Sequence, residues 1–448
     1  MTHSEFSASA TARLSLLPLL LFVGLFLGSG VYWQTQGVDY AFYQLPGHVA
    51  IIPALVLAIW LHRAPLTESI DLMIKGAGNN NIITMCLIYL LAGAFASVAT
   101  ATGGVDAAVN AGLSLIPAEW LLPGLFVLAA LISLAMGTSM GTIGALAPIA
   151  VGFTEQAQLY PPLVAGVLLG GAMFGDNLSV ISDTTIAATR TQGAAMKDKF
   201  RENVRIAVPA ALLTLLVYII VTTESAPVSI QEVNWTGVVP YAAILILALI
   251  GFNVFAVLLL GILLAALQGA VFADYQLQNI GKDIATGFTS MQEIFLLSMF
   301  VGGLSEFVKQ QGGLQWIAGK IAGLAEGLKL AGNKAQQLAI GVLVFISNGC
   351  TANNTVSIVL TGDVSKALAQ EHNISPKRSA SVLDIFACVS QGLIPYGAQA
   401  LLLAASFGIS PLQVVTYSYY CMILAVAAII AVLVSKQASS EAAEAASA

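Results

Sequence analysis

Residues 174–185 read Phe-Gly-Asp-Asn-Leu-Ser-Val-Ile-Ser-Asp-Thr-Thr, and this polar stretch lies inside an apolar run from Pro162 to Ala188. Carboxylates are costly to place within such a run, so Asp176 and Asp183 are functional candidates. They are seven residues apart, which would place them on one face of a continuous helix with Ser179 and Ser182 between them. The alternative is that the two acids pair with buried donors or cap helix ends.

The whole chain has the apolar character of this stretch. Its 448 residues are 58% hydrophobic and 9% charged, with a mean hydropathy of +0.87, whereas about a quarter of the residues of a soluble protein are charged. This excludes a soluble multidomain enzyme and predicts an all-α polytopic membrane protein surrounded by a lipid bilayer. A net charge of −6 without a basic cluster excludes a nucleic-acid binder. Four cysteines at unrelated spacings suggest neither a disulfide framework nor a zinc site, and we expect no cofactor.

Charge placement predicts the orientation of the chain. Lys and Arg are retained on the cytoplasmic side of membrane proteins, so the loop that carries Arg190, Lys197, Lys199, Arg201 and Arg205 should lie inside. Segments 103–119 and 224–237 carry acids without a basic residue and should lie outside. We expect a multi-pass protein of a cell membrane, the inner membrane of a bacterium, with both termini in the cytoplasm. The apolar runs that could span it are 14–33, 47–61, 82–101, 162–188, 206–223, 256–273, 292–308, 379–405 and 412–435.

Two further apolar segments cannot be simple spans, because the orientation of the loops around them would then be violated. The orientation predicts re-entrant hairpins at about residues 120–154 and 336–363, each with a polar break near its middle. Irregular backbone at that depth must be buried in protein or line a polar cavity. The polar breaks are therefore candidate substrate sites, although close helix packing through Gly137 and Gly141 is an alternative. The candidates are Gly137, Thr138, Ser139, Gly141, Thr142, Asn348, Thr351, Asn353, Asn354 and Thr355.

An internal repeat organises these segments. Gly93 aligns with Gly302 at an offset of 209 residues, the Gly-Gly pairs at 103 and 312 match at the same offset, and Asp176 aligns with Asp384 at 208. The first copy begins inside and the second outside, so we predict inverted repeats over 1–223 and 237–435. Each holds about five transmembrane helices, one hairpin and one helix broken at the midplane, at 161–189 and 379–405. Residues 436–448 are predicted to be a disordered cytoplasmic tail.

This architecture is typical of secondary transporters and not of enzymes. Na⁺ prefers carboxylate, hydroxyl and carbonyl oxygens, and unwinding of the helix at Gly175 would free carbonyls beside Asp176. A carboxylate removed from water also takes up a proton more readily, so Na⁺ and H⁺ could compete for Asp176. In the second half Asp384 and Ser390 are the matching candidates, and Gln391 replaces the second acid. A salt bridge to Lys377 near the membrane surface is the alternative for Asp384.

Three stretches carry a family resemblance. Residues 137–144 (Gly-Thr-Ser-Met-Gly-Thr-Ile-Gly), 175–185 and 382–396 resemble the NhaC family of Na⁺/H⁺ antiporters, in a superfamily that also contains Na⁺-coupled dicarboxylate carriers. The resemblance implies opposed hairpins, a homodimer and an elevator-like movement. It places an ion site at 176–184, with Asp176 and Ser179 as Na⁺ ligands, and Asn177 stands where antiporters tend to have a basic residue. The matching residues are Asp176, Ser179, Ser182, Asp183 and Thr184.

The leading hypothesis is exchange of Na⁺ for H⁺ at one shared carboxylate site. An alternative is a Na⁺-coupled carrier of an amino acid or organic carboxylate, with the small organic solute held by the hairpin tips. An ion site should be small and lined by oxygens, whereas a solute site should be roomy and should contain a donor for a carboxylate. A different class is an intramembrane aspartyl protease, in which Asp176 and Asp384 would share one proton.

Overall fold

The computed structural model describes residues 11–38, 41, 44–115, 117, 120–221, 233–327 and 333–435, and the regular structure in these ranges is helical. The predicted disordered tail, 436–448, lies outside them. Six helices in the described part of the chain are long and apolar enough to cross a membrane, judged by length and composition. The prediction of an all-α polytopic membrane protein is confirmed at this level. The six are Thr11–Trp33, Asn80–Ala101, Pro161–Gln192, Met196–Val221, Val254–Phe272 and Pro376–Phe407.

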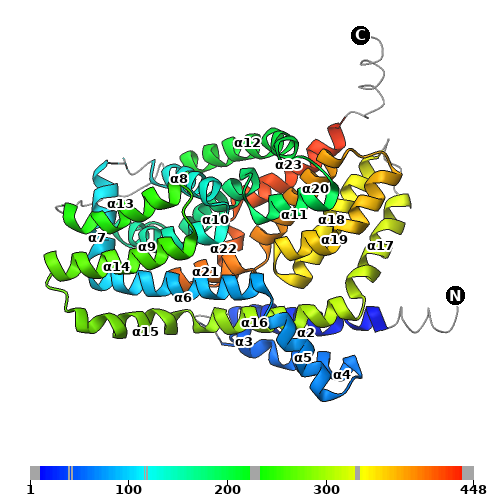
Figure 1. Ribbon diagram of the computed structural model, residues 1–448, viewed down its shortest axis with the longest axis horizontal. Helices are drawn as coiled ribbons and strands as arrows, with labels where there is room; N and C mark the ends of the chain where they lie inside the picture. Colours follow the sequence, from blue (N-terminus) through cyan, green and yellow to red (C-terminus); the bar gives the residue numbers. More distant parts are fainter. Residues whose placement is uncertain are drawn as a thin grey trace, which may run out of the picture.

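The order of the helices along the chain can be followed in Figure 1. The first half holds α2 (Leu17–Thr35), α3 (Gly47–Ala50), α4 (Ile52–His62), α5 (Leu66–Ala77), α6 (Asn80–Ala101), α7 (Gly104–Leu115), α8 (Leu121–Met136), α9 (Ser139–Gln156), α10 (Pro161–Leu178), α11 (Asp183–Gln192) and α12 (Met196–Val221). The second half holds α13 (Trp235–Leu249), α14 (Val254–Phe272), α15 (Ile280–Ser290), α16 (Gln292–Gln310), α17 (Gly313–Gly327), α18 (Lys334–Thr351), α19 (Asn354–Glu371), α20 (Pro376–Leu393), α21 (Ala398–Phe407), α22 (Pro411–Thr416) and α23 (Tyr419–Val434).

Two of the long apolar segments are broken helices. The chain leaves the helix between α10 and α11, and again between α20 and α21, where Ser182 and Gly397 are both extended. The first break follows Leu178 and does not lie at Gly175, where unwinding was predicted. Gly175 lies within α10 and packs closely on α8, where a Cβ would overlap the carbonyl oxygen of Ala130. The sequence pattern located the break to within a turn but misjudged the role of this glycine.

Two helix pairs, α8–α9 and α18–α19, turn sharply at polar tips. Gly137 and Ala352 each end the first helix in the left-handed conformation, at φ values of 69° and 51°. The next residues, Thr138 and Asn353, are extended and cap the second helix, accepting hydrogen bonds from the backbone N–H groups of Gly141 and Val356. Side-chain caps of this kind satisfy amide donors that a helix start leaves unpaired. The polar residues of both tips therefore have a structural role as helix caps.

In each half, one helix of the pair is tied to the broken helix by two side-chain hydrogen bonds to carbonyl oxygens. The spacing along the chain is the same in both halves, 39 and 45 residues. The bonds run from Ser133 Oγ to Ala172 O at 2.6 Å, from Ser179 Oγ to Leu134 O at 3.0 Å, from Asn348 Nδ2 to Ala387 O at 3.0 Å and from Ser390 Oγ to Phe345 O at 2.9 Å.

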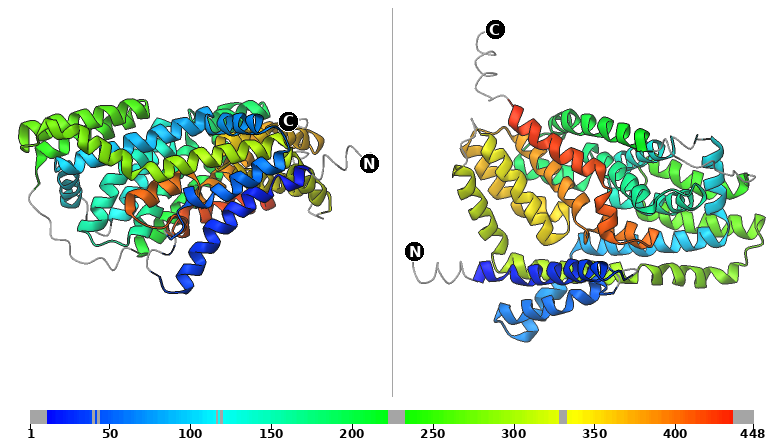
Figure 2. Two further views of the ribbon diagram at one scale, coloured as in Figure 1. Left: turned by 90° about the horizontal axis from the view of Figure 1, so that it is seen from below. Right: turned by 180° about the vertical axis from the view of Figure 1, so that it is seen from behind.

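Helices α6 and α16 lie side by side and antiparallel (Figure 1). A Cβ on Gly302 would lie 3.1 Å from Ile82, and a Cβ on Gly93 would lie 2.6 Å from Met291. Between these contacts the hydroxyl groups of Tyr89 and Ser298 are hydrogen-bonded at 3.2 Å, across 209 residues of sequence. Helices α2, α4 and α5 pack against α16 (Figure 2).

Candidate functional site

A cavity of about 80 Å³ lies where both helix-pair tips, both broken helices and α6 meet. Ten of the residues predicted from the sequence line it: Gly137, Thr138, Ser139, Asp176, Ser182, Asp183, Thr184, Asn353, Asn354 and Thr355. The other lining residues are Asn81, Thr84, Met85, Ile88, Met140, Gln391 and Gln399. Segments from both halves of the chain therefore form one site, and no Lys, Arg or His is among its described lining residues.

Asp176 is the buried acid of this cavity. Its side chain lies in the last turn of α10 and accepts hydrogen bonds from Ser182 Oγ at 2.5 Å and from Ser139 Oγ at 3.0 Å. Ser182 Oγ also lies 2.9 Å from Thr184 Oγ1. Hydroxyl groups from the helix break and from the α8–α9 tip thus surround one carboxylate, a donor set that suits a hard monovalent cation.

Asp183 takes a different position from the one predicted for a continuous helix. The break turns the chain after Leu178, so Asp183 begins α11 and is exposed. It still lines the cavity, whereas Asp176 is buried within it. The two acids therefore do not lie on one face of a continuous helix, which their spacing of seven residues had suggested.

A chain of amides from the second half reaches Asp176. Gln391 donates from Nε2 to Gln399 Oε1 at 2.7 Å, and Gln399 donates from Nε2 to Ser139 Oγ at 3.0 Å. Gln399 was not among the residues predicted from the sequence, although it is one of two polar residues in α21 and comes directly after the helix break. Asn81 and Thr84 of α6 were also missed.

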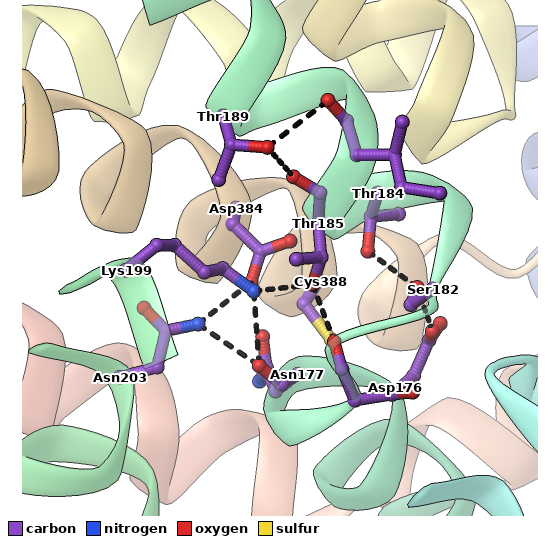
Figure 3. A network of polar contacts seen from close by, with 12 residues as sticks. Asp176, Asn177, Ser182, Thr184, Thr185, Thr189, Lys199, Asn203, Asp384 and Cys388 are labelled. Atoms are coloured by element: carbon purple, nitrogen blue, oxygen red, sulfur yellow. Dashed lines mark hydrogen bonds and ion pairs between the residues drawn. The ribbon is translucent and has the colours of Figure 1, made fainter. Parts of the chain in front are cut away.

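A second polar cluster lies on the other side of the α10 terminus (Figure 3). Lys199 of α12 and Asp384 of α20 form an ion pair at 2.7 Å, and each side chain is 1% exposed. The Lys199 ammonium also donates to the backbone carbonyl of Asn177 at 3.1 Å and to Thr185 Oγ1 at 2.7 Å. Asn203 Nδ2 donates to the same Asn177 carbonyl and to Asp384 Oδ2, at 3.0 and 2.8 Å.

This cluster corrects two interpretations of the sequence. Asp384 is buried and pairs with Lys199, while Lys377 lies 4.0 Å from Glu202 instead. Lys199 was counted as a charge of the cytoplasmic loop, but its side chain reaches the interior. The signal that could have found it is the spacing of Lys199 and Asn203, which places two polar residues on one face of α12 where the apolar run begins.

The remaining predicted site residues lie outside the 80 Å³ cavity. Ser179, expected as a Na⁺ ligand, donates to Leu134 O, and Ser390 and Asn348 make the matching bonds in the second half. Asn177 donates to the Tyr420 hydroxyl at 3.4 Å. The hydroxyls of Thr142 and Thr351 donate to the backbone carbonyls of Thr138 and Asn353, and Gly141 packs on Val254.

Comparisons with known proteins agree on one group of transporters. A family model described as the Na⁺/H⁺ antiporter family matches residues 7–223. The Na⁺/H⁺ antiporter NhaC of Alkalihalophilus pseudofirmus is 24% identical over 74% of this chain and 78% of its own length, and NhaC of Bacillus subtilis is 27% identical over 77% and 82%. The malate-2H⁺/Na⁺-lactate antiporter of Bacillus subtilis is 25% identical over 76% and 78%.

Proposed function

Since the chain belongs with the NhaC-type Na⁺/H⁺ antiporters, we propose that it exchanges Na⁺ for protons and that Asp176 is the carboxylate the two cations share. The observation that carries this proposal is a contrast between two buried acids. Asp384 is neutralised by Lys199, whereas Asp176 is held by hydroxyl groups in a small cavity. The charge of Asp176 is therefore the one that an incoming cation can balance.

The contacts of Asp176 suggest how one cation excludes the other. In the Na⁺-bound form, ionised Asp176 and the hydroxyl oxygens of Ser139, Ser182 and Thr184 would face the ion. Protonation of Asp176 removes the negative charge, and the hydroxyl groups can then bond with the carboxylic acid instead of with Na⁺. In this proposal Ser182, and not Ser179, is a ligand of Na⁺, because the Ser179 hydroxyl donates to the backbone carbonyl of Leu134 on α8.

We further propose that the two halves are inverted repeats, with re-entrant hairpins at about 120–154 and 336–363. Three observations support this: the antiparallel contacts of α6 and α16, the matched hydrogen bonds of the two broken helices, and the matched turns at Gly137 and Ala352. An elevator-like movement in a homodimer of a bacterial inner membrane, with cytoplasmic termini, belongs to the same proposal. Na⁺ is then cargo and not a resident cofactor.

Transport of an organic solute is the second candidate. One relative is named as a malate and lactate antiporter, which favours this alternative. The cavity at Asp176 supports it less well, because about 80 Å³ without a lining cation is a poor fit for an organic carboxylate. The protease alternative is removed, because the relatives are transporters and Asp384 is paired with Lys199.

Purified protein in liposomes that contain a pH-sensing dye tests the proposal. Addition of Na⁺ should change the internal pH without any other solute, and Asp176→Asn should abolish the response. Asp363→Asn, which removes an exposed acid on α19, is the matched control and should retain it. A response that requires an amino acid or a dicarboxylate would replace exchange by solute transport, and an unchanged response in Asp176→Asn would refute the shared site.

A further inference from the structure

A second and larger cavity lies beside α16, whereas the small cavity lies beside α6. It measures about 490 Å³ and lies between the junction of α15 and α16, the C-terminal part of α21, and α2 with α3. Its wall at this junction consists of Thr289, Ser290, Glu293, Ile294 and Leu297, and its wall on α21 includes Leu401, Ala404 and Ala405. The contacts of Asp176 and the proposed exchange make no use of this space.

The two cavities have matching walls. The small cavity is lined on α6 by Asn81, Thr84, Met85 and Ile88. Four of the five residues at the α15–α16 junction follow these by 209 positions in the same order, and Thr289 is the one without a counterpart. This is the separation of Tyr89 and Ser298, which meet between the two helices. Equivalent faces of α6 and α16 thus each border a cavity, but only the face on α6 borders the cation site in this structure.

We propose that the 490 Å³ cavity is the second station of the cation: the space into which the Asp176 site opens when the tips and broken helices have moved from α6 to α16. This inference rests on the proposed function and adds a site to it. Glu293 is the acidic residue among the polar groups that line the second station, which also include His48, Thr289 and Ser290, and it occupies the position of Thr84 in the matching wall. Its carboxylate would attract monovalent cations there.

The length of the movement follows from α21. The small cavity contacts this helix at Gln399, and the large cavity contacts it at Leu401, Ala404 and Ala405. These separations of two to six residues correspond, at a rise of 1.5 Å per residue, to about 3–9 Å along the helix. A displacement of roughly this size would bring the start of α21, and with it the cation site, to the α16 face.

One specific contact should form when the two halves take each other's roles, with the tip of the first half beside α16. Asn353, the cap of α19, lies with its Nδ2 3.8 Å from the sulfur of Met85. The equivalent cap in the first half is Thr138, and the equivalent of Met85 is Ile294. These two residues line different cavities in this structure, and they should meet when the site opens at α16.

Cysteine cross-linking tests this contact. Met85→Cys/Asn353→Cys should cross-link in the state described here, and Thr138→Cys/Ile294→Cys should cross-link in the other, with linked peptides quantified by mass spectrometry. Reversing the Na⁺ and pH gradients should change the two yields in opposite directions. Single-cysteine variants control for the four native buried cysteines. If the first pair links but the Thr138 pair stays at the level of its controls under both gradients, and a Thr138→Cys/Leu297→Cys pair does the same, the second station is refuted.

Transport kinetics test Glu293. Glu293→Gln should raise the KM for Na⁺ about fivefold on one face of the membrane only, the size expected for one water-screened charge, with the maximal rate retained. Glu68→Gln removes an exposed acid from the first turn of α5 and should change neither constant. A KM for Na⁺ that stays unchanged in Glu293→Gln, or that rises by the same factor on both faces, would overturn the assignment of Glu293.

These outcomes can be separated from failure of the proposed exchange. Absence of Na⁺-driven proton movement in the unmodified protein would refute the exchange, while the cross-linking yields would still report whether the site moves between the two faces. Normal exchange combined with absence of the Thr138–Ile294 link would refute the second station alone.

Discussion

Tyr89 and Ser298 stand 209 residues apart in the chain, and their hydroxyl oxygens lie 3.2 Å apart in the interior. Cys86 and the carbonyl of Phe295, with the same separation in sequence, lie 3.7 Å apart one turn away. Residues with equivalent places in two repeats meet only near the axis that relates the repeats. The α6–α16 contact is therefore the centre about which the two proposed halves are arranged.

The first prediction concerns this central hydrogen bond. Tyr89→Phe should lower the free energy of unfolding by about 1 kcal/mol, because one buried hydroxyl loses its partner. Ser298→Ala should cost a similar amount, and the double variant less than the sum, since both remove the same bond. Thermal unfolding in detergent measures the effect, with the exposed Tyr32→Phe as control. Strictly additive losses would show that the two hydroxyls do not interact.

The second prediction separates two serines that the sequence treats alike. Ser182→Ala should raise the KM for Na⁺ about tenfold, because it removes a hydroxyl that contacts the Asp176 carboxylate. Ser179→Ala should leave the KM unchanged and lower the free energy of unfolding by about 1 kcal/mol, because its hydroxyl bonds to Leu134 O. Initial rates in dye-loaded liposomes measure the first effect. The reverse pattern would return Ser179 to the ion site.

The third prediction concerns the buried ion pair. Lys199→Met should lower the free energy of unfolding by about 3–5 kcal/mol, because it leaves the Asp384 charge buried without its partner. Lys199→Met/Asp384→Leu should be less destabilised than Lys199→Met, because no unpaired charge remains. Unfolding temperatures and yields of folded protein measure both. A double variant less stable than Lys199→Met would show that stability depends on the pair itself and not on avoiding a lone charge.

The fourth prediction concerns the approach of α10 to α8. Gly175→Ala should lower the free energy of unfolding by about 1–3 kcal/mol, because the added methyl group would overlap the carbonyl of Ala130. Gly124→Ala is the matched control on α8, where a Cβ meets no atom within 4 Å, and it should not destabilise the protein. Equal melting temperatures for the two variants would contradict the close packing.

The sequence predicted most of what depends on local pattern. Apolar runs, the polar breaks within them and the 209-residue repeat are all readable along the chain, and ten predicted residues line one cavity. The inverted orientation of the repeats stays a prediction. Asp176 was selected correctly as a cavity residue because an acid in an apolar run is costly wherever the chain turns.

Other features depend on the fold and could not be predicted. Lys199 lies in a basic segment, and although its spacing to Asn203 marks a polar face of α12, its pairing with Asp384, 185 residues later, is set by the fold. The different roles of Ser179 and Ser182 depend on where the helix stops, because a break rotates the following residues away from the helical pattern. Gln399 joins the site through a chain of two hydrogen bonds that no spacing in the sequence encodes.

The ion pair of Lys199 and Asp384 has a consequence for leakage. Lys199 and Asp384 neutralise each other, and Asp176 is the third buried ionisable side chain of this group. The group is therefore neutral when Asp176 binds either Na⁺ or a proton, and it carries one negative charge when Asp176 binds neither. Carrying an unbalanced charge through the apolar interior is far costlier than carrying a neutral group. Under the proposed exchange, the empty carrier would thus be arrested, and a cation could leave on one side only if another returned.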